Sequence, residues 1–430
     1  MFRPQLLSRS SLLLKRSLST QTVSPTAQKF IDLEHATSAH NYHPLPVVLT
    51  RGLGVHVWDV DGKQYFDFLS AYSAVNQGHC HPRIVAALKD QAEKLTLTSR
   101  AFHSDLMGDY CDYITKMFGY DKVLPMNTGV EAGETAVKMA RKWAYKVKGV
   151  TRDQAKVIFA RHNFWGRTLA AVSSSTDPES YDDYGPYMPG FDIVDYDNLD
   201  QLEAAFKADP NVAAFMVEPI QGEAGVVVPS AGYLEGVRRL CDQYNVLWIA
   251  DEVQTGLART GKMLAVHHYD ARPDIICLGK ALSGGTIPVS AVLADNAVMN
   301  VIAPGTHGST YGGNPLACRV AKESLQVLVD EDLAGNAQKQ GEIFRSELEG
   351  MGSPFVQVVR GKGLLNAIVI DDSATSASGG AWNLCLKMAD RGLLAKPTHG
   401  NIIRFAPPLV INDSQMGQCL DILRSVLVPK

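Results

Sequence analysis

The chain has 430 residues, with 41 Lys and Arg against 45 Asp and Glu, so its formal net charge is 41 − 45 = −4 with histidine neutral. Hydrophobic residues make up 46% and charged residues 20%, which is typical of a folded globular protein and excludes a disordered or fibrous one. No long run of Lys and Arg offers a phosphate-binding footprint, which argues against a dedicated nucleic-acid binder. No apolar stretch approaches the ~20 residues of a membrane span, so we also exclude a membrane-spanning protein.

The first residues of the chain differ in composition from the rest. No acidic residue precedes Asp32, and the cations of this segment are Arg3, Arg9, Lys15 and Arg16. Leucines and cations can take opposite faces of a helix here, which is the amphipathic, acid-free pattern of a mitochondrial transit peptide. The sequence therefore predicts a transit peptide over residues 1–20 and a location in the mitochondrial matrix; the alternative is a frayed basic terminus.

Between residues 21 and 70 we predict an N-terminal segment with one hairpin. Val55–Trp58 and Lys63–Phe68 alternate apolar and polar residues, as half-buried strands do. Asp61-Gly62 lies between them and favours a two-residue type I′ turn. The hairpin is expected to pack with a smaller domain at the end of the chain.

Residues 71–320 are predicted to form the large domain. Short apolar runs alternate here with helical patterns such as Leu199–Lys207 and Tyr233–Tyr244, and the runs are Lys156–Ala160, Ala213–Val217, Val246–Ala250 and Ile275–Leu278. Buried strands with helices between them predict an α/β fold, with a mostly parallel sheet flanked by helices.

Residues 321–430 are predicted to form a smaller α+β domain. A long helical pattern comes first, followed by a strand-like run at Leu364–Ile370. A helix around Trp382–Arg391 and a final helix from Ser414 complete this part of the chain. A chain this long needs more than one core, because single cores stop growing near ~250–300 residues.

The scattered cysteines and paired histidines do not predict a metal site. Seven cysteines, an odd number without a CxxC pair, favour neither a disulfide framework nor a zinc ribbon and fit a reducing compartment. His79-Cys80-His81 has the spacing of metal ligands, but Pro82 and the apolar residues after it favour the start of a helix. We therefore predict no metal.

Chemistry is expected at the carboxyl ends of the parallel strands, where open sheets bind ligands. Lys280 follows one strand, and desolvation at a sheet edge lowers a lysine pKa and frees a neutral amine for a Schiff base. The alternative, for this residue alone, is a lysine that extends from a strand end to solvent. Asp251 directly follows the run Val246–Ala250 and is expected near the same sheet edge, and a carboxylate ~4 Å from a cation contributes about 4 kcal/mol at an effective dielectric of ~20. This suffices to keep a pyridine nitrogen protonated, so the pair predicts pyridoxal phosphate.

A phosphate site is expected at the start of the helical pattern Glu131–Val147. The preceding segment Asn127–Val130 contains Gly129, which lets a ligand approach the backbone, and free N–H groups at a helix start attract phosphate. The alternative is a plain capping turn with Thr128 as the cap. A second Gly-rich turn, His307–Asn314, offers hydroxyl groups without net charge.

From about Thr26 to its end the sequence resembles the class III, fold-type-I pyridoxal-phosphate aminotransferases, and within them the members that transfer the δ-amine of ornithine. The segments that carry the resemblance are His40–Pro46, Asn76–His79, Asn127–Ala132, Asn163–Arg167, Glu218–Gly225, Asp251–Gly256, Gly279-Lys280, Gly308–Tyr311 and Ile403–Phe405. Related members that act on acetylornithine or 4-aminobutyrate share the cofactor machinery and stay as alternatives. A nicotinamide-dependent dehydrogenase is disfavoured because no GxGxxG opens a strand-to-helix turn.

The resemblance implies a role for each residue of the cofactor site. Lys280 would form the Schiff base and move the proton, and Asp251 would hold the pyridinium. The remaining cofactor residues would be Gln254 at the phenolic oxygen, Phe164 on the ring, Gly129 and Val130 at the phosphate, and Thr310 reaching the same phosphate from a partner subunit. A two-fold homodimer with shared active sites follows from the last role.

The resemblance also implies a substrate-binding set, namely Tyr42, Tyr72, Trp165, Arg167, Glu223 and Arg404. Its substrates would be ornithine and a 2-oxo acid, preferably 2-oxoglutarate. Arg167 suits the far carboxylate through its bidentate fork. Arg404 suits the α-carboxylate of glutamate, and Glu223 would neutralise Arg404 while ornithine is bound. Without the family, Glu223 and Arg404 would be read as a structural ion pair.

Overall fold

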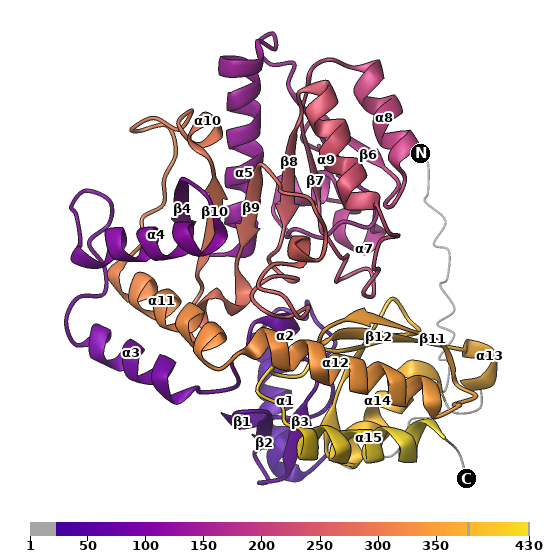
Figure 1. Cartoon of the computed structure of the whole chain (residues 1–430). Helices are drawn as coiled ribbons and strands as arrows, with labels where there is room; N and C mark the ends of the chain where they lie inside the picture. Colours follow the sequence, from indigo (N-terminus) through magenta and orange to yellow (C-terminus); the bar gives the residue numbers. More distant parts are fainter. Residues whose placement is uncertain (1–22, 376–378, 429–430) are drawn as a thin grey trace, which may run out of the picture.

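The computed structural model describes residues 23–375 and 379–428, so the transit peptide predicted over residues 1–20 lies outside the described residues (Figure 1). The described chain forms a large unit around one seven-stranded sheet and a smaller unit with two four-stranded sheets. None of the described helices is long and apolar enough to cross a membrane.

The large sheet has the strand order β4-β10-β9-β8-β7-β5-β6. Its strands are β4 (Lys122–Met126), β5 (Lys156–Ala160), β6 (Phe191–Val194), β7 (Val212–Val217), β8 (Leu247–Asp251), β9 (Ile275–Leu278) and β10 (Ser290–Ala294). Only β10 runs antiparallel to its neighbours, β9 and β4. The mostly parallel sheet and its four predicted strands are confirmed, with bounds that differ by at most one residue at either end.

Helices bury both faces of this sheet, so its strands are apolar on both sides. On β5, Val157 and Phe159 join the core cluster that contains α5 (Gly129–Trp143). Ile158 and Ala160 alternate with them and face the cluster under α8 (Leu199–Ala208) and α9 (Tyr233–Tyr244). In Figure 1, α5 stands on one side of the sheet and α8 and α9 on the other.

The other helical segments connect or cover these layers. They are α1 (Pro25–Thr37), α2 (Ser70–Ser73), α3 (Pro82–Ala92), α4 (Asp105–Phe118), α6 (Leu169–Ser173), α7 (Pro178–Tyr181), α10 (Asn296–Met299), α11 (Pro315–Asp330), a π-helical turn Ala144–Lys148, and short 3₁₀ turns Ala265–His268 and Lys280–Ser283. Pro82 is the first residue of α3, which confirms the predicted helix start.

The N-terminal hairpin lies beside the C-terminal part of the chain (Figure 1). Strands β1 (Leu49–Leu53), β2 (His56–Asp59) and β3 (Gln64–Asp67) are antiparallel, and β3 pairs in parallel with β13 (Leu393–Leu394). The predicted type I′ turn is wrong, because only Gly62 has a positive φ, of 84°, and type I′ also needs one at Asp61. The Asp59 carboxylate instead accepts the N–H groups of Asp61 and Lys63.

The smaller unit contains an antiparallel sheet of order β11-β12-β15-β14. Its elements are α12 (Leu333–Gly350), β11 (Val356–Lys362), β12 (Leu365–Ile370), α13 (Asp372–Thr375), α14 (Gly380–Asp390), β14 (Lys396–Thr398), β15 (Ile402–Phe405) and α15 (Asp413–Leu427). The predicted strand and the predicted helices of this region are confirmed as β12, α14 and α15.

Arg259 connects the two units from within the protein. Its side chain is 0% exposed. Both Nε and a terminal nitrogen donate to Asn76 Oδ1, at 3.1 and 2.6 Å, and the other terminal nitrogen donates to the carbonyls of Leu364 and Pro407. Burial lowers the pKa of this guanidinium to about 9.

Candidate active site

The carboxyl ends of three neighbouring strands, β7, β8 and β9, bring Lys280 together with two carboxyl side chains, Asp251 and Glu218. Asp251 is the last residue of β8, and Lys280 follows β9 after Gly279. The two strands are parallel neighbours, with Asp251 opposite Cys277. Lys280 has a φ of 44°, so its backbone turns sharply away from the strand, as sparsely populated conformations at functional sites do.

Asp251 and Lys280 are buried close to each other, and both burial and their opposite charges shift their pKa values. Asp251 is 5% exposed, and its Oδ1 accepts the N–H of Val253 at 3.0 Å. Burial raises the pKa of this carboxyl to about 6, although the Lys280 charge opposes the rise. Burial lowers the pKa of the Lys280 ammonium, against the attraction of Asp251 and Glu218. Within the described chain, the Lys280 ammonium has no hydrogen-bond partner, so its nitrogen is available to a ligand.

Glu218 is a member of this cluster that the sequence analysis did not single out. It directly follows β7 and is 6% exposed. Its Oε1 accepts the N–H of Phe164 at 3.1 Å and its Oε2 the N–H of Gly222 at 3.0 Å, so one carboxyl joins the loops after β5 and β7. Burial, and then the charge of Asp251, raise the pKa of Glu218 to about 8. The signal was present, because Glu218 follows a buried strand much as Asp251 ends one.

Gln254 packs closely on the loop after β7 at Gly222. A Cβ atom on Gly222 would clash with Gln254 Oε1, so a larger residue there would displace the Gln254 amide. Gln254 is 7% exposed, and Arg404 approaches its Oε1 at 3.4 Å while donating to the Gly222 carbonyl at 3.2 Å. The amide is therefore fixed between the strand ends and Arg404.

The start of α5 offers free backbone donors beside Asp251. Thr128 and Glu131 form a capping box, in which Glu131 accepts the Thr128 N–H at 2.6 Å. The N–H groups of Gly129 and Val130 have no acceptor among the described residues. A Cβ on Gly129 would lie 2.8 Å from Val253 Cγ1, so glycine lets the helix start approach the β8 end. Two free N–H groups at a helix start fit a phosphate.

The loop that carries Thr310 is hydrogen-bonded to α5 and to the residues just before it. His307 Nε2 lies 2.8 Å from Thr135 Oγ1, and Asn127 Nδ2 donates to Ser309 Oγ at 2.9 Å. Thr310 itself is exposed. This chain therefore presents Thr310 on its surface beside the first turn of α5, rather than inside its own cluster.

Phe164, Trp165 and Arg167 follow β5 but occupy different environments. The guanidinium carbon of Arg167 lies 5.5 Å from the centre of the Phe164 ring, and Arg167 is exposed. Trp165 is 6% exposed, stacks on Phe159 with ring centres 5.6 Å apart, and donates its indole N–H to Ser174 Oγ at 2.7 Å. Trp165 thus lies in the core, apart from the other predicted substrate residues.

Arg404 on β15 forms an ion pair with Glu223. A terminal nitrogen of Arg404 lies 2.9 Å from Glu223 Oε2, and the side chains are 6% and 31% exposed respectively. The guanidinium carbon lies 5.0 Å from the centre of the Tyr72 ring. Tyr42 is 65% exposed and lines, with Tyr72, a cavity of about 430 Å³. Arg404 thus packs against Tyr72, which lines this cavity together with Tyr42.

Tyr72 is held by an unusual stretch of backbone. Ser70, Ala71, Tyr72 and Ser73 have φ values of 48°, 47°, 60° and 71°, all in the left-handed region that favours glycine. Asp67 Oδ1 accepts the N–H groups of Leu69 and Ser70, at 2.8 and 2.9 Å, and holds the start of this turn. Such strained backbone concentrates at ligand sites.

Both histidines of the His79-Cys80-His81 motif are hydrogen-bonded to carboxylates. His79 Nε2 lies 2.7 Å from Asp67 Oδ2, and His81 Nε2 lies 3.0 Å from Glu331 Oε1. Among residues 23–375 and 379–428, no group of three or more His, Cys, Asp or Glu side chains is arranged to hold a metal ion.

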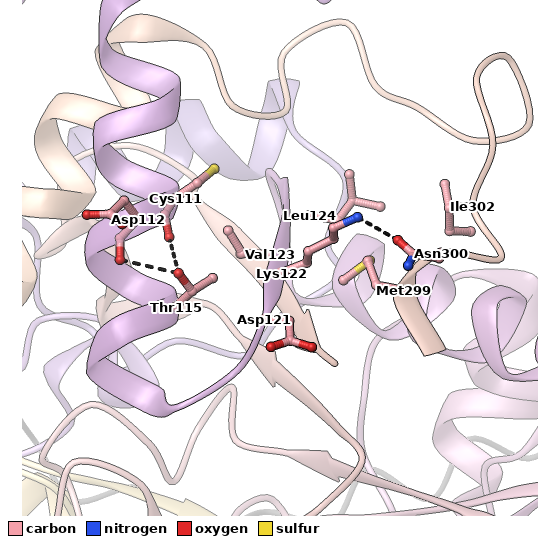
Figure 2. A pocket seen from close by; sticks show the side chains of 10 residues that line it. All are labelled: Cys111, Asp112, Thr115, Asp121, Lys122, Val123, Leu124, Met299, Asn300 and Ile302. Carbon is pink, nitrogen blue, oxygen red and sulfur yellow. Dashed lines mark hydrogen bonds between the residues drawn. The ribbon is translucent and has the colours of Figure 1, made fainter. Parts of the chain in front are cut away.

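A second hollow, of about 420 Å³, lies between α4, β4 and α10 (Figure 2). Its polar side chains are committed to local contacts: Lys122 donates to Asn300 Oδ1 at 2.5 Å, and Thr115 to the Cys111 carbonyl at 2.8 Å. Burial raises the pKa of the Cys111 thiol to about 11, which leaves it unreactive. The reactive cluster is therefore the one at the strand ends.

That cluster has the parts that pyridoxal phosphate requires. A desolvated lysine suits the aldehyde, a buried carboxylate suits the ring nitrogen, and two free N–H groups suit the phosphate. The residues of this chain therefore fit the cofactor, and the fold and the site define a pyridoxal-phosphate-dependent enzyme.

Comparison with known proteins gives the family. A model of the class-III aminotransferases matches residues 37–427. A Drosophila melanogaster protein named "Ornithine aminotransferase, mitochondrial" is 63% identical over 98% of this chain and 97% of its own length. The crystal structure of ornithine aminotransferase from Toxoplasma gondii superimposes with a TM-score of 0.90 at 50% identity, over 93% of this chain and 94% of that chain. One named acetylornithine aminotransferase, from Elizabethkingia anophelis, gives 0.85 at 55% identity, over 93% and 98%. The chain belongs to the class-III aminotransferases, and it is a transaminase with pyridoxal 5′-phosphate as its cofactor.

Proposed function

We propose that this chain is a mitochondrial ornithine δ-aminotransferase. It transfers the δ-amine of L-ornithine to a 2-oxo acid, preferably 2-oxoglutarate, and yields glutamate 5-semialdehyde and glutamate. The semialdehyde then loses water and cyclises to pyrroline-5-carboxylate. The observation that carries the proposal is the Glu223–Arg404 pair beside the Lys280 cluster, because it gives one pocket two charge patterns.

Lys280 performs the proton transfer. When bound, pyridoxal phosphate takes up the amino group and stabilises the electron pair left by the departing proton. The Lys280 Nζ takes that proton from the substrate carbon that bears the reacting amine, for which it must be neutral. Burial supplies the neutral form by lowering the lysine pKa. Asp251 would hold a positive charge at the ring nitrogen of the bound cofactor, and Gln254 would hold its phenolic oxygen.

Arg167 and Arg404 divide the recognition of carboxylates. Arg167 binds the far carboxylate of either substrate through its planar fork. Arg404 binds the α-carboxylate of glutamate or 2-oxoglutarate. Ornithine presents its δ-amine at the reacting position and has no carboxylate there, so Glu223 stays on Arg404 at 2.9 Å and neutralises it.

We further propose a homodimer in the mitochondrial matrix. The exposure of Thr310 beside the start of α5 supports a role at the partner subunit's phosphate. The acid-free leader supports import, as does the mitochondrial name of the Drosophila relative. A fusion of residues 1–30 to a reporter should accumulate in the matrix, and a cytosolic reporter would contradict this location.

A substrate panel tests the function. Ornithine, N-acetylornithine, 4-aminobutyrate and lysine are each supplied with 2-oxoglutarate, and pyrroline-5-carboxylate and glutamate are measured. We expect ornithine to give the highest kcat/KM. The 55% identity with a protein named acetylornithine aminotransferase makes that activity the second candidate, and preference for N-acetylornithine would establish it instead.

A further inference from the structure

Glu223 is surrounded by one hairpin of the smaller unit. β15 contributes Arg404, whose guanidinium binds the Glu223 carboxylate at 2.9 Å. The turn between β14 and β15 contributes His399, whose Nε2 donates to the backbone carbonyl of Glu223 at 3.1 Å. β14 contributes Lys396, whose Cα is paired with that of Arg404 across the two strands. The backbone of Glu223 is thus held by His399 and its carboxylate separately by Arg404, so the carboxylate can change partner without moving the backbone contact.

Lys396 is a second cation beside this carboxylate. Its side chain is half-buried and lines the 430 Å³ cavity together with Tyr42 and Tyr72. Within the described chain its ammonium makes no hydrogen bond and no ion pair. Burial lowers its pKa, while the charge of Glu223 raises it and that of Arg404 lowers it further. Lys396 therefore interacts with both members of the pair without being bound to either.

Another cation near this loop, Arg360, already has a hydrogen-bond partner. Arg360 donates its Nε to the Gly225 carbonyl at 2.9 Å. A carboxylate that leaves Arg404 inside a half-buried pocket loses its counter-charge, which is costly unless another cation replaces it. Lys396 is available for this, because it lies on the neighbouring strand and has an unpaired ammonium.

We propose that Lys396 accepts the Glu223 carboxylate while Arg404 is occupied by the α-carboxylate of glutamate or 2-oxoglutarate. This inference rests on the proposed function, in which Glu223 masks Arg404 during the ornithine half-reaction. Lys396 is then a positioning residue that acts through Glu223. Lys396 therefore favours binding of the dicarboxylic substrates. It has little effect on ornithine, because the Glu223–Arg404 pair stays closed while ornithine is bound.

The two half-reactions, measured separately in the holoenzyme, test this role. Lys396→Met removes the charge and keeps most of the stem. We expect it to raise the KM for glutamate about fivefold more than the KM for ornithine, with a smaller change in kcat, as for a partly exposed ion pair. Lys396→Arg should restore the glutamate KM. Lys387→Met, a lysine of α14 whose ammonium has no partner among the described residues, is the matched control.

A double-mutant cycle distinguishes the alternatives. In a Glu223→Ala background, Lys396→Met should change the glutamate KM by less than about twofold, because nothing is left to position. An undiminished loss in that background would overturn the proposal and place Lys396 directly on the substrate carboxylate. Equal losses with both substrates would overturn it in favour of a structural role. If Glu223→Ala alone left both half-reactions unchanged, the masking of Arg404 in the proposed function would be refuted instead.

Discussion

The cofactor side and the substrate side of this site are built differently. On the cofactor side, Asp251, Glu218 and Gln254 are 5%, 6% and 7% exposed and are fixed by strand ends and by contacts with backbone groups. On the substrate side, Tyr42 is 65% exposed, Arg167 is exposed, and the Glu223 side chain is 31% exposed. The cofactor side lies at the edge of the packed large sheet, whereas the substrate side lies on loops and on a hairpin of the smaller unit.

This difference separates chemistry from selectivity. Buried groups on rigid strands keep perturbed charges in place, and such charges are what proton transfer requires. Half-exposed groups on loops can exchange partners at low cost, which one pocket needs to accept two substrates. Substitutions on the cofactor side should therefore affect both half-reactions, and substitutions on the substrate side should affect them unequally.

The largest effect should come from Lys280→Ala. Removing the only group that moves the proton should lower kcat more than about a thousandfold in both half-reactions. The free N–H groups at the start of α5 are untouched, so the cofactor content, measured by absorbance and by phosphate analysis, should remain substantial. Lys262→Ala, at an exposed lysine, is the control. A near wild-type rate in Lys280→Ala would contradict the assignment.

Asp251→Asn should come next. The amide cannot balance a charged ring nitrogen, so kcat should fall about a hundredfold to a thousandfold with both ornithine and glutamate. KM values should change much less, because the Asp251 carboxylate accepts the Val253 N–H and, within the described chain, makes no hydrogen bond or ion pair with the substrate residues. Steady-state kinetics with each substrate would measure these values. A loss of kcat confined to one half-reaction would show that the cofactor side does not serve both half-reactions equally.

Glu223→Ala should affect the half-reactions in opposite directions. The Arg404 guanidinium becomes permanently available to an α-carboxylate, so kcat/KM should rise about fivefold with glutamate and fall about fivefold with ornithine. Some ornithine should also react at its α-amine, because its carboxylate can now bind Arg404. Product analysis would detect this. Glu349→Ala, at an exposed glutamate of α12, should leave both values unchanged.

The smallest effect concerns the pH dependence of stability. Glu218 has a pKa of about 8 in the folded chain, against 4.5 ordinarily, so the folded state keeps a proton that the unfolded state loses. The free energy of unfolding of the cofactor-free protein should therefore fall as the pH rises from about 4.5 to about 8. Glu218→Gln removes this contribution, so its melting temperature should fall less across that range, by about 2–4 °C. Glu93→Gln, at an exposed residue, should retain the wild-type slope.

The arrangement of the cofactor side can be predicted from the sequence because strand position determines it. Asp251 and Lys280 end up together since neighbouring parallel strands deliver their carboxyl ends to one edge. Glu218 directly follows β7 and obeys the same rule, so its position at this edge was equally predictable. The start of α5 was predictable for a similar reason, since Thr128 and Glu131 mark the capping box.

The substrate side depends on tertiary contacts that sequence does not encode locally. Arg404 and Lys396 meet through a short antiparallel pairing of β14 with β15, which periodicity over so few residues cannot reveal. Trp165 follows a strand as Phe164 does, and only the packing of its ring on Phe159 distinguishes a core residue from a substrate contact. The left-handed run through Tyr72 contains no glycine that would have marked it.

The buried Arg259 has a consequence for any exchange of the two units of this protein. Its guanidinium donates hydrogen bonds to Asn76 of the large unit and to the carbonyls of Leu364 and Pro407 in the smaller unit. A hybrid gene that joined the first half of this protein to the second half of a relative would have to supply carbonyls in register at positions 364 and 407. Without them an uncompensated charge is left in the interior, at a cost of about 3–5 kcal/mol. Exchange of one unit alone is therefore expected to destabilise this protein unless the carbonyls at positions 364 and 407 keep their places around Arg259.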